Sequence, residues 1–196
     1  MSESTESDPR PLSLARVLGI QAHANRLANR RLQAALANLS TSELHARRTS
    51  FFPTIIGTLN HLLAVDLYYI AALHGEPEMV DSYKRFAPHD ELEPYAAAQD
   101  ASDQKLVAFC DKLDDAAANA VVHMLHTPEP TRSDLACLVL NHLFMHQTHH
   151  RGQVHSMLSG THLKPPQLDE FILRVDEPFR VMEMSALGWS ERDVFG

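Results

Sequence analysis

The sequence is poor in several residue types that mark common classes of protein. Glycine occurs 7 times in 196 residues, roughly half the usual share, which argues against a turn-rich all-β fold. The two cysteines, Cys110 and Cys137, cannot form a disulfide framework, so the cytoplasm is the expected compartment. No uninterrupted apolar run approaches the roughly 18 residues of a membrane span. We therefore expect a cytoplasmic protein without a membrane partner.

Basic residues are also scarce relative to acidic ones. Lysine and arginine number 17 against 25 aspartates and glutamates, which gives a net charge of −8 with histidine neutral. This sign argues against nucleic acid as a partner. Residues 1–10 are acidic and polar, and they lack the basic and apolar segments of a secretory signal. We expect a flexible tail over residues 1–10, followed by a single domain over residues 11–196.

Apolar residues recur with the period of an α-helix in long stretches, which predict helices at residues 12–39, 53–74, 95–118 and 133–159. Gly75 and Gly160 are expected to end the second and fourth of these helices, and Ser133 is the expected N-cap of the fourth. Ser40 begins a sequence typical of a capping box. The pattern predicts an all-α fold, a four-helix bundle with short C-terminal helices at residues 168–173 and 178–187. An irregular all-α domain with steeper crossing angles is the alternative.

The connections between the expected helices contain most of the prolines. Three prolines between residues 76 and 94 indicate a long connection with at most a short helical piece. Residues 127–130 (TPEP) are expected to form a loop. The apolar residues 121–125 just before it predict a short strand or an extended entry into that loop.

Histidine is the residue type that is abundant, with 13 copies, five of them within fourteen residues: His142, His146, His149, His150 and His155. A helix turns by about 100° per residue, so His146 and His150 fall on the apolar stripe of the fourth helix, where core residues belong. His142, His149 and Gln153 lie to one side of His146. Arg151 points away and is expected to face solvent or an acidic partner.

Several neutral imidazoles on one buried face are costly unless something satisfies their ring nitrogens together, and a divalent metal does so. The spacing permits three ligand pairs, namely His146/His150, His142/His146 and His146/His149. The alternative is a histidine-rich helix whose rings bond to neighbours or water. His61, on the second helix, is the expected third ligand, with Thr58 and Tyr68 on its face and His23 as the other helical candidate.

Two neighbouring residue types are given structural roles. Asp66 is about 140° from His61 around the helix, so it is expected in a buried or interhelical salt bridge rather than at the same ion. Cys110 and Cys137 are expected to be small core residues. Gln147 follows His146, which excludes the HExxH arrangement of zinc proteases. No Glu-x-x-His pair, P-loop or Gly-x-Ser-x-Gly motif is present.

The stretch at residues 141–155 (NHLFMHQTHHRGQVH) resembles the signature of the DinB family of metal-dependent proteins, and residues 50–66, from SFFP to TLNHLLAVD, resemble its second-helix motif. Residues 25–32 and 166–171 are also similar to that family. The resemblance implies a four-helix bundle that binds one divalent metal, and it selects His61, His146 and His150 as the ligands. Residues 156–162 depart from the family pattern, because members of the family usually have a longer turn at this position.

The resemblance also implies an activity, because the family includes transferases and isomerases that use low-molecular-weight thiols. We therefore expect metal-dependent thiol transfer on a small-molecule substrate, with hydrolysis as the second possibility and a non-catalytic metal-binding stress protein as the third. Zinc or nickel is the expected metal, with iron, copper or manganese as alternatives. The expected contacts to substrate or ligands are His142, His149, Gln153, Tyr68, Thr58 and Asn25. Apolar residues after Pro166 predict a homodimer.

Overall fold

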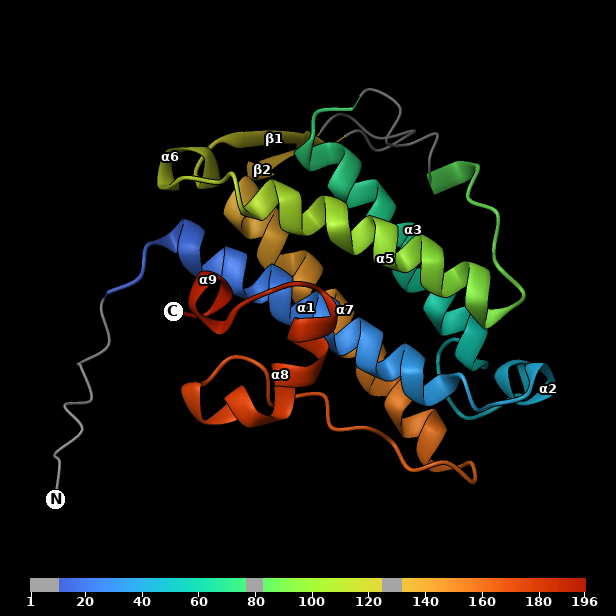
Figure 1. Cartoon of the computed structure of the whole chain (residues 1–196). Helices are drawn as coiled ribbons and strands as arrows, with labels where there is room; N and C mark the ends of the chain where they lie inside the picture. The colour runs from blue at the N-terminus through green and yellow to red at the C-terminus, as the bar shows by residue number, and fades with distance from the viewer. Residues whose placement is uncertain (1–10, 77–82, 125–131) are drawn as a thin grey trace, which may run out of the picture.

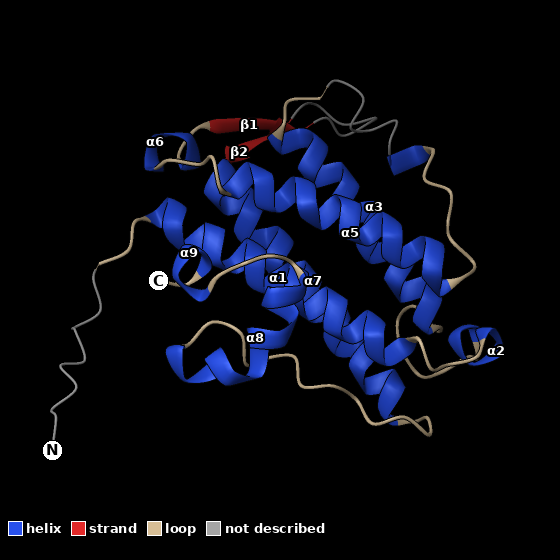
Figure 2. Cartoon of the chain, viewed as in Figure 1, coloured by secondary structure: helices blue, strands red, loops and turns tan. Residues whose placement is uncertain are grey.

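The computed structural model describes residues 11–76, 83–124 and 132–196. Most of these residues are helical, and one two-stranded antiparallel sheet is the non-helical element shown in Figure 2. The predicted all-α class is therefore confirmed. The expected N-terminal tail at residues 1–10 and the expected loop at residues 127–130 lie outside the described residues.

Four long helices form the body of the molecule (Figure 1), and they are α1 (Leu14–Leu36), α3 (Ile55–Leu73), α5 (Leu92–Cys110) and α7 (Ala136–Ser159). Helix α1 packs against α5 and α7, and α3 packs against the same two helices. Their inward faces are leucine-rich, with Leu18, Leu32, Leu59, Leu106 and Leu140 almost completely buried. These helix pairs are the contacts that a four-helix bundle requires. That the helices cross at the small angles of such a bundle stays a prediction.

The boundaries of these helices follow their local chemistry. Thr54 caps α3 by accepting a hydrogen bond from the backbone N–H of Gly57 at 3.1 Å. Gly75 ends α3 with φ of 66°, a left-handed conformation that glycine adopts without steric cost. The predicted capping box at Ser40 is confirmed, and it begins the short helix α2 (Thr41–His45).

Helix α3 is the most apolar helix among the described residues. By length and mean hydropathy it could cross a membrane. Asn60, His61 and Asp66 interrupt its apolar sequence, so no apolar run spans the whole helix. In the structure 72% of its most apolar window is buried, because α5 and α7 cover it. Burial inside the protein is the usual reason for such a composition in a core helix.

The third predicted helix is divided in two. Helix α5 begins at Leu92, earlier than predicted, with Pro94 in its first turn where a missing N–H costs no hydrogen bond. It ends at Cys110, and the chain turns before the short helix α6 (Asp115–Ala118). The carboxylate of Asp114 caps α6 by accepting from the backbone N–H of Ala117 at 2.7 Å. This cap explains why the pattern did not continue as one helix to residue 118.

A small hairpin covers one end of the helices, built from β1 (Val121–Met124) and β2 (Arg132–Leu135). The predicted strand near residue 121 is confirmed. The predicted N-cap at Ser133 is wrong, because Ser133 lies in β2 and its hydroxyl bonds to His123 Nδ1 at 2.8 Å. Helix α7 instead begins after Leu135 without a side-chain cap.

The C-terminal segment packs along the outside of α1 (Figure 1), with its core formed by Ala24, Leu27, Ala28, Phe171, Met184 and Val194. It contains a 3-10 turn, η1 (Arg174–Asp176), and two helices, α8 (Glu177–Ala186) and α9 (Glu191–Val194). Arg16, on the first turn of α1, donates to the backbone oxygens of Asp193 and Gly196 at 3.2 and 3.1 Å. The segment is thus bonded to α1 as well as packed on it.

The helix predicted at residues 168–173 is absent, and the chain there is non-helical. Side chains satisfy the backbone of this stretch instead. The buried guanidinium of Arg180 donates to the backbone oxygens of Phe171 and Leu173 at 2.9 and 2.8 Å. The carboxylate of Asp176 accepts from the N–H groups of Ile172 and Leu173. With these partners supplied, the backbone needs no helical ladder.

A layer of buried polar side chains crosses the interior of the four long helices. Its members are Asn25 and Asn29 of α1, Asp66 of α3, Tyr95, Gln99 and Asp103 of α5, and Gln147 and Arg151 of α7. Arg151 was expected at the surface or beside an acidic partner. Its side chain is buried, and Nη1 donates to the side-chain oxygens of Asn25, Asn29 and Gln147. A buried guanidinium needs such partners, and periodicity on one helix does not reveal them.

Two carboxylates complete this layer. Asp66 accepts from Gln99 Nε2 at 2.7 Å and from Gln147 Nε2. It is buried between helices as expected, although these two hydrogen-bond donors are amides rather than a cation. Asp103 accepts from Asn29 Nδ2 at 3.0 Å and from Gln99 Nε2 at 3.1 Å. Burial raises the pKa of Asp66 to about 6. Burial, with Asp66 as the second cause, raises the pKa of Asp103 to about 8.

The protonation of Asp103 makes stability depend on pH. Between its unfolded pKa near 3.8 and its folded pKa near 8, the folded chain holds a proton that the unfolded chain releases, so stability falls as pH rises. We expect Asp103→Asn to flatten this decline, by up to about 1.4 kcal/mol per pH unit. Urea unfolding from pH 5 to 8.5 measures it, with the exposed Asp90→Asn as the control. Parallel profiles for Asp103→Asn and the parent would contradict this assignment.

Candidate metal centre

Three histidines from two helices meet at one place. His61 comes from α3, and His146 and His150 come from successive turns of α7. Their ligand atoms all lie within 4.8 Å of one another, and the Nε2 atoms of His61 and His146 are 3.0 Å apart. These are the three residues that the family resemblance selects. Among the described residues, no cysteine, aspartate, glutamate or further histidine joins the group.

All three imidazoles are held in the neutral form. Burial lowers the pKa of His146 to about 3, with the nearby rings of His150 and His61 adding to the effect. The pKa values of His61 and His150 are lowered too, in both cases chiefly by burial. Metal ligation requires a neutral imidazole with a free lone pair. The lowered pKa values therefore favour the ligand-competent neutral form of all three histidines, most strongly for His146.

Gln153 orients the ring of His150 from one turn further along α7. Nδ1–H of His150 donates to Gln153 Oε1 at 2.7 Å, and Gln153 Nε2 donates to His149 Nε2 at 3.0 Å. Because Nδ1 carries the proton, the lone pair of His150 is on Nε2 and is available to a ligand. A hydrogen bond to the outer nitrogen is the arrangement that usually fixes a metal-binding histidine.

Phe52 forms an aromatic wall on the α3 side of the group. Its ring stacks on His61 with centroids 4.3 Å apart and lies 5.8 Å from the ring of His150. Phe52 precedes α3 and was not among the predicted site residues. Its position just before the helix of His61 was the available evidence for a role at the site, but helical periodicity does not place a residue outside the helix.

The donor set fits a metal ion. Two neutral imidazole lone pairs cannot face each other at 3.0 Å, so either a proton or a cation must lie between His61 and His146. His146 Nδ1 is also buried and has no hydrogen-bond partner among the described residues. Zinc binds imidazole nitrogens at about 2.0–2.1 Å, almost always with four ligands in a tetrahedron.

The remaining candidates are distributed around and away from this group. His142 and His149 are exposed and flank it: the ring of His142 lies 6.5 Å from that of His146, and the ring of His149 lies 4.8 Å from that of His150. Tyr68 is buried beside Tyr69, about two helical turns from His61 along α3. Thr58 donates to the backbone oxygen of Thr54 at 3.0 Å, which uses its hydroxyl within the helix.

Asn25, one of the expected contact residues, lies on α1 outside the three-histidine group. Its side-chain oxygen accepts from Arg151, on the side of α7 that faces α1. The two cysteines, Cys110 and Cys137, are buried in the core as expected and are free thiols. His23 is buried on α1, where Nδ1 bonds to the backbone oxygen of Gly19 at 2.9 Å.

Fold and site together define an all-helical protein with a three-histidine group that could hold a metal ion. The sequence model of the DinB family matches residues 20–177, which is most of the chain. The protein therefore belongs to the DinB family. A comparison with curated proteins gives no match.

Proposed function

We propose that the protein binds one divalent transition metal through His61, His146 and His150. The observation that carries this proposal is the meeting of three neutral imidazoles within 4.8 Å, two of them with their Nε2 atoms 3.0 Å apart. The fixed tautomer of His150 and the family membership support it. Imidazole ligands favour zinc or nickel, and iron, copper and manganese remain candidates for titration.

Substitution of the ligands tests this proposal directly. We expect about one equivalent of zinc or nickel in the protein purified without a histidine tag, and none in His61→Ala, His146→Ala or His150→Ala. Elemental analysis and equilibrium dialysis measure the content. His162→Ala, which removes an exposed loop histidine, is the control and should retain the metal. A parent protein that takes up no metal on titration would overturn the proposal.

We further propose that the site is catalytic and that it transfers a low-molecular-weight thiol. A bound metal would act as a Lewis acid that lowers the pKa of a thiol or of water. Three protein ligands leave a coordination position open, unlike a closed structural site. Among the described residues, no cysteine or carboxylate joins the group, so a thiol or a water molecule at the open position would be the nucleophile. The family resemblance favours a thiol substrate in the cytoplasm over hydrolysis, the second candidate.

Turnover of a thiol with an electrophile tests the catalytic proposal. With zinc-loaded protein, L-cysteine and monochlorobimane, sulfur replaces chloride on the bimane carbon and the thiol proton passes to buffer, which gives a fluorescent product. We expect a rate at least about tenfold above that of zinc in buffer, and its loss in His146→Ala. An equal rate for the zinc-loaded protein and for zinc in buffer would contradict thiol transfer. Cleavage of an ester in the absence of thiol would favour the hydrolase.

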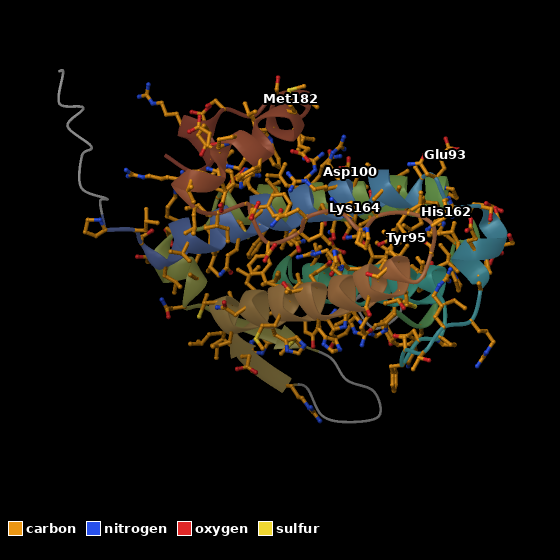
Figure 3. The ribbon with its side chains drawn as sticks, turned by 90° about the horizontal axis from the view of Figure 1, so that it is seen from below. Glu93, Tyr95, Asp100, His162, Lys164 and Met182 are labelled. Atoms are coloured by element: carbon orange, nitrogen blue, oxygen red, sulfur yellow. The ribbon has the colours of Figure 1, made fainter. Side chains whose placement is uncertain are left out.

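We also propose that the C-terminal segment forms a homodimer interface. Its outer side exposes Leu173, Val175, Phe179 and Met182, the last with 79% of its surface accessible. In Figure 3 Met182 lies at the outer edge of the molecule, on the side of the C-terminal helices. Apolar side chains gathered in this way usually mark an interface. A C2 dimer would use the same surface on both copies.

Sedimentation tests the dimer. We expect the parent to sediment as a dimer at micromolar concentration and Met182→Glu to shift it to the monomer, because the new charge would be desolvated at the interface. Met145→Glu, at a similarly exposed methionine of α7, is the control and should remain dimeric. A single boundary at the monomer mass for the parent would refute the proposal.

A further inference from the structure

A small cavity of about 210 Å³ lies beside the metal centre, where the hairpin covers α3 and α7. Its walls are formed by Tyr69, Met124, Arg132, Asp134, Leu138, Val139 and His142. It combines an apolar floor with four polar side chains from three elements. No part of the proposed metal chemistry uses the two charged residues among them.

The register of the hairpin explains why Arg132 and Asp134 face this cavity. Met124 lies opposite Arg132, and Val122 lies opposite Asp134. In-register residues project to the same face of an antiparallel pair, and Val122 and Met124 are buried against the helices. The face of β2 that lines the cavity therefore carries one cation and one anion two residues apart, and both residues are exposed to solvent. Arg132 also opposes the rise in the pKa of Tyr68 that burial and Tyr69 cause, which places its charge close to α3.

His142 lies between the cavity and the metal centre along α7. The ring of His142 lies 5.2 Å from that of Tyr69 and 6.5 Å from that of His146. A molecule in contact with His142 would therefore lie one helical turn of α7 from His146. Burial raises the pKa of Tyr69, which keeps its hydroxyl protonated as a donor to an anion.

We propose that this cavity binds the α-amino-carboxylate group of an amino-acid substrate, with Arg132 holding the carboxylate and Asp134 the ammonium. Arginine pairs with carboxylates through two parallel N–H bonds, and a neighbouring aspartate completes recognition of a zwitterion. This inference rests on the proposed function for one point: a thiol on the side chain of such a substrate would extend towards His146. The substrate class would then be amino-acid thiols rather than neutral thiols.

Methylated analogues test the cavity separately from the metal, because a thioether supplies no thiolate. The metal-free full chain is titrated with S-methyl-L-cysteine, methylthiopropionate, which lacks the ammonium, and methylthioethylamine, which lacks the carboxylate. Shifts of the backbone amides of Tyr69 and His142 in NMR spectra report binding. We expect S-methyl-L-cysteine to bind about tenfold more tightly than either analogue, since each loses one charged hydrogen bond.

Paired variants assign each charge. Arg132→Gln should weaken the binding of S-methyl-L-cysteine about tenfold and leave the binding of methylthioethylamine unaffected. Asp134→Asn should also weaken the binding of S-methyl-L-cysteine about tenfold, but leave the binding of methylthiopropionate unaffected. The controls are Arg47→Gln and Asp90→Asn, at exposed positions, which should change nothing. Hydrogen–deuterium exchange of β1 and β2 should be the same in all four variants, so that a disrupted hairpin is not taken for a lost ligand contact.

Two results would overturn the proposal: equal affinity for all three probes, or no binding of S-methyl-L-cysteine at millimolar concentration. Either would leave the charges of β2 with the role of protecting an edge strand from pairing with another chain. These results are independent of metal uptake. A protein that binds the probe without taking up metal disproves the metal proposal alone, and one that binds metal without the probe disproves only the cavity.

Discussion

The buried guanidinium of Arg151 is the constraint on which the rest of the structure depends. A charge without water must be hydrogen-bonded and balanced, and no single helix can meet both demands. Amide oxygens of α1 and α7 accept its N–H groups, and the carboxylate of Asp66 on α3 balances its charge. Asp103 on α5, with its pKa raised to about 8, adds a second negative charge only at higher pH. Burial still lowers the pKa of Arg151 to about 10. The four long helices are thus held in one mutual register by a polar layer that tolerates little sliding.

This layer sets the geometry of the metal centre. Gln147 follows His146 and binds Asp66, which lies on the same helix as His61. One turn later, Arg151 follows His150. The hydrogen-bonded contacts between α3 and α7 therefore lie directly beside the ligand positions, and they hold the two helices close enough for His61 and His146 to meet. The same helix presents neutral imidazoles on one side and a compensated charge on the other.

Periodicity predicted the features that a single helix determines. The four long helices and the common face of His146 and His150 follow from residue spacing, and so does the burial of Cys110 and Cys137. His61 was the expected third ligand from its place on the second helix, with His23 as the other candidate. The family resemblance decided between these candidates and among the three pairs on the fourth helix, because spacing along one helix cannot identify a residue on another. The same limitation explains why solvent and an acidic partner were both expected for Arg151, of which the structure supports the acidic partner. Its angle away from His146 was correctly derived, but the direction pointed at α1 rather than at solvent, and only the packing of the helices decides that. The helix predicted at residues 168–173 is absent for a related reason. Side chains further along the chain, Arg180 and Asp176, make hydrogen bonds with the backbone of this stretch in place of helical ones.

The bonds from Arg16 to residues 193 and 196 join positions 177 and 180 residues apart in sequence. One apolar side of α1 is covered only by this late segment, through Phe171, Met184 and Val194. During synthesis, α1 must therefore wait with that side exposed until nearly the whole described chain has emerged. Contacts of such long range slow folding and leave intermediates prone to aggregation. A slow final docking step is the expected kinetic consequence of placing α1 and the C-terminal helices side by side.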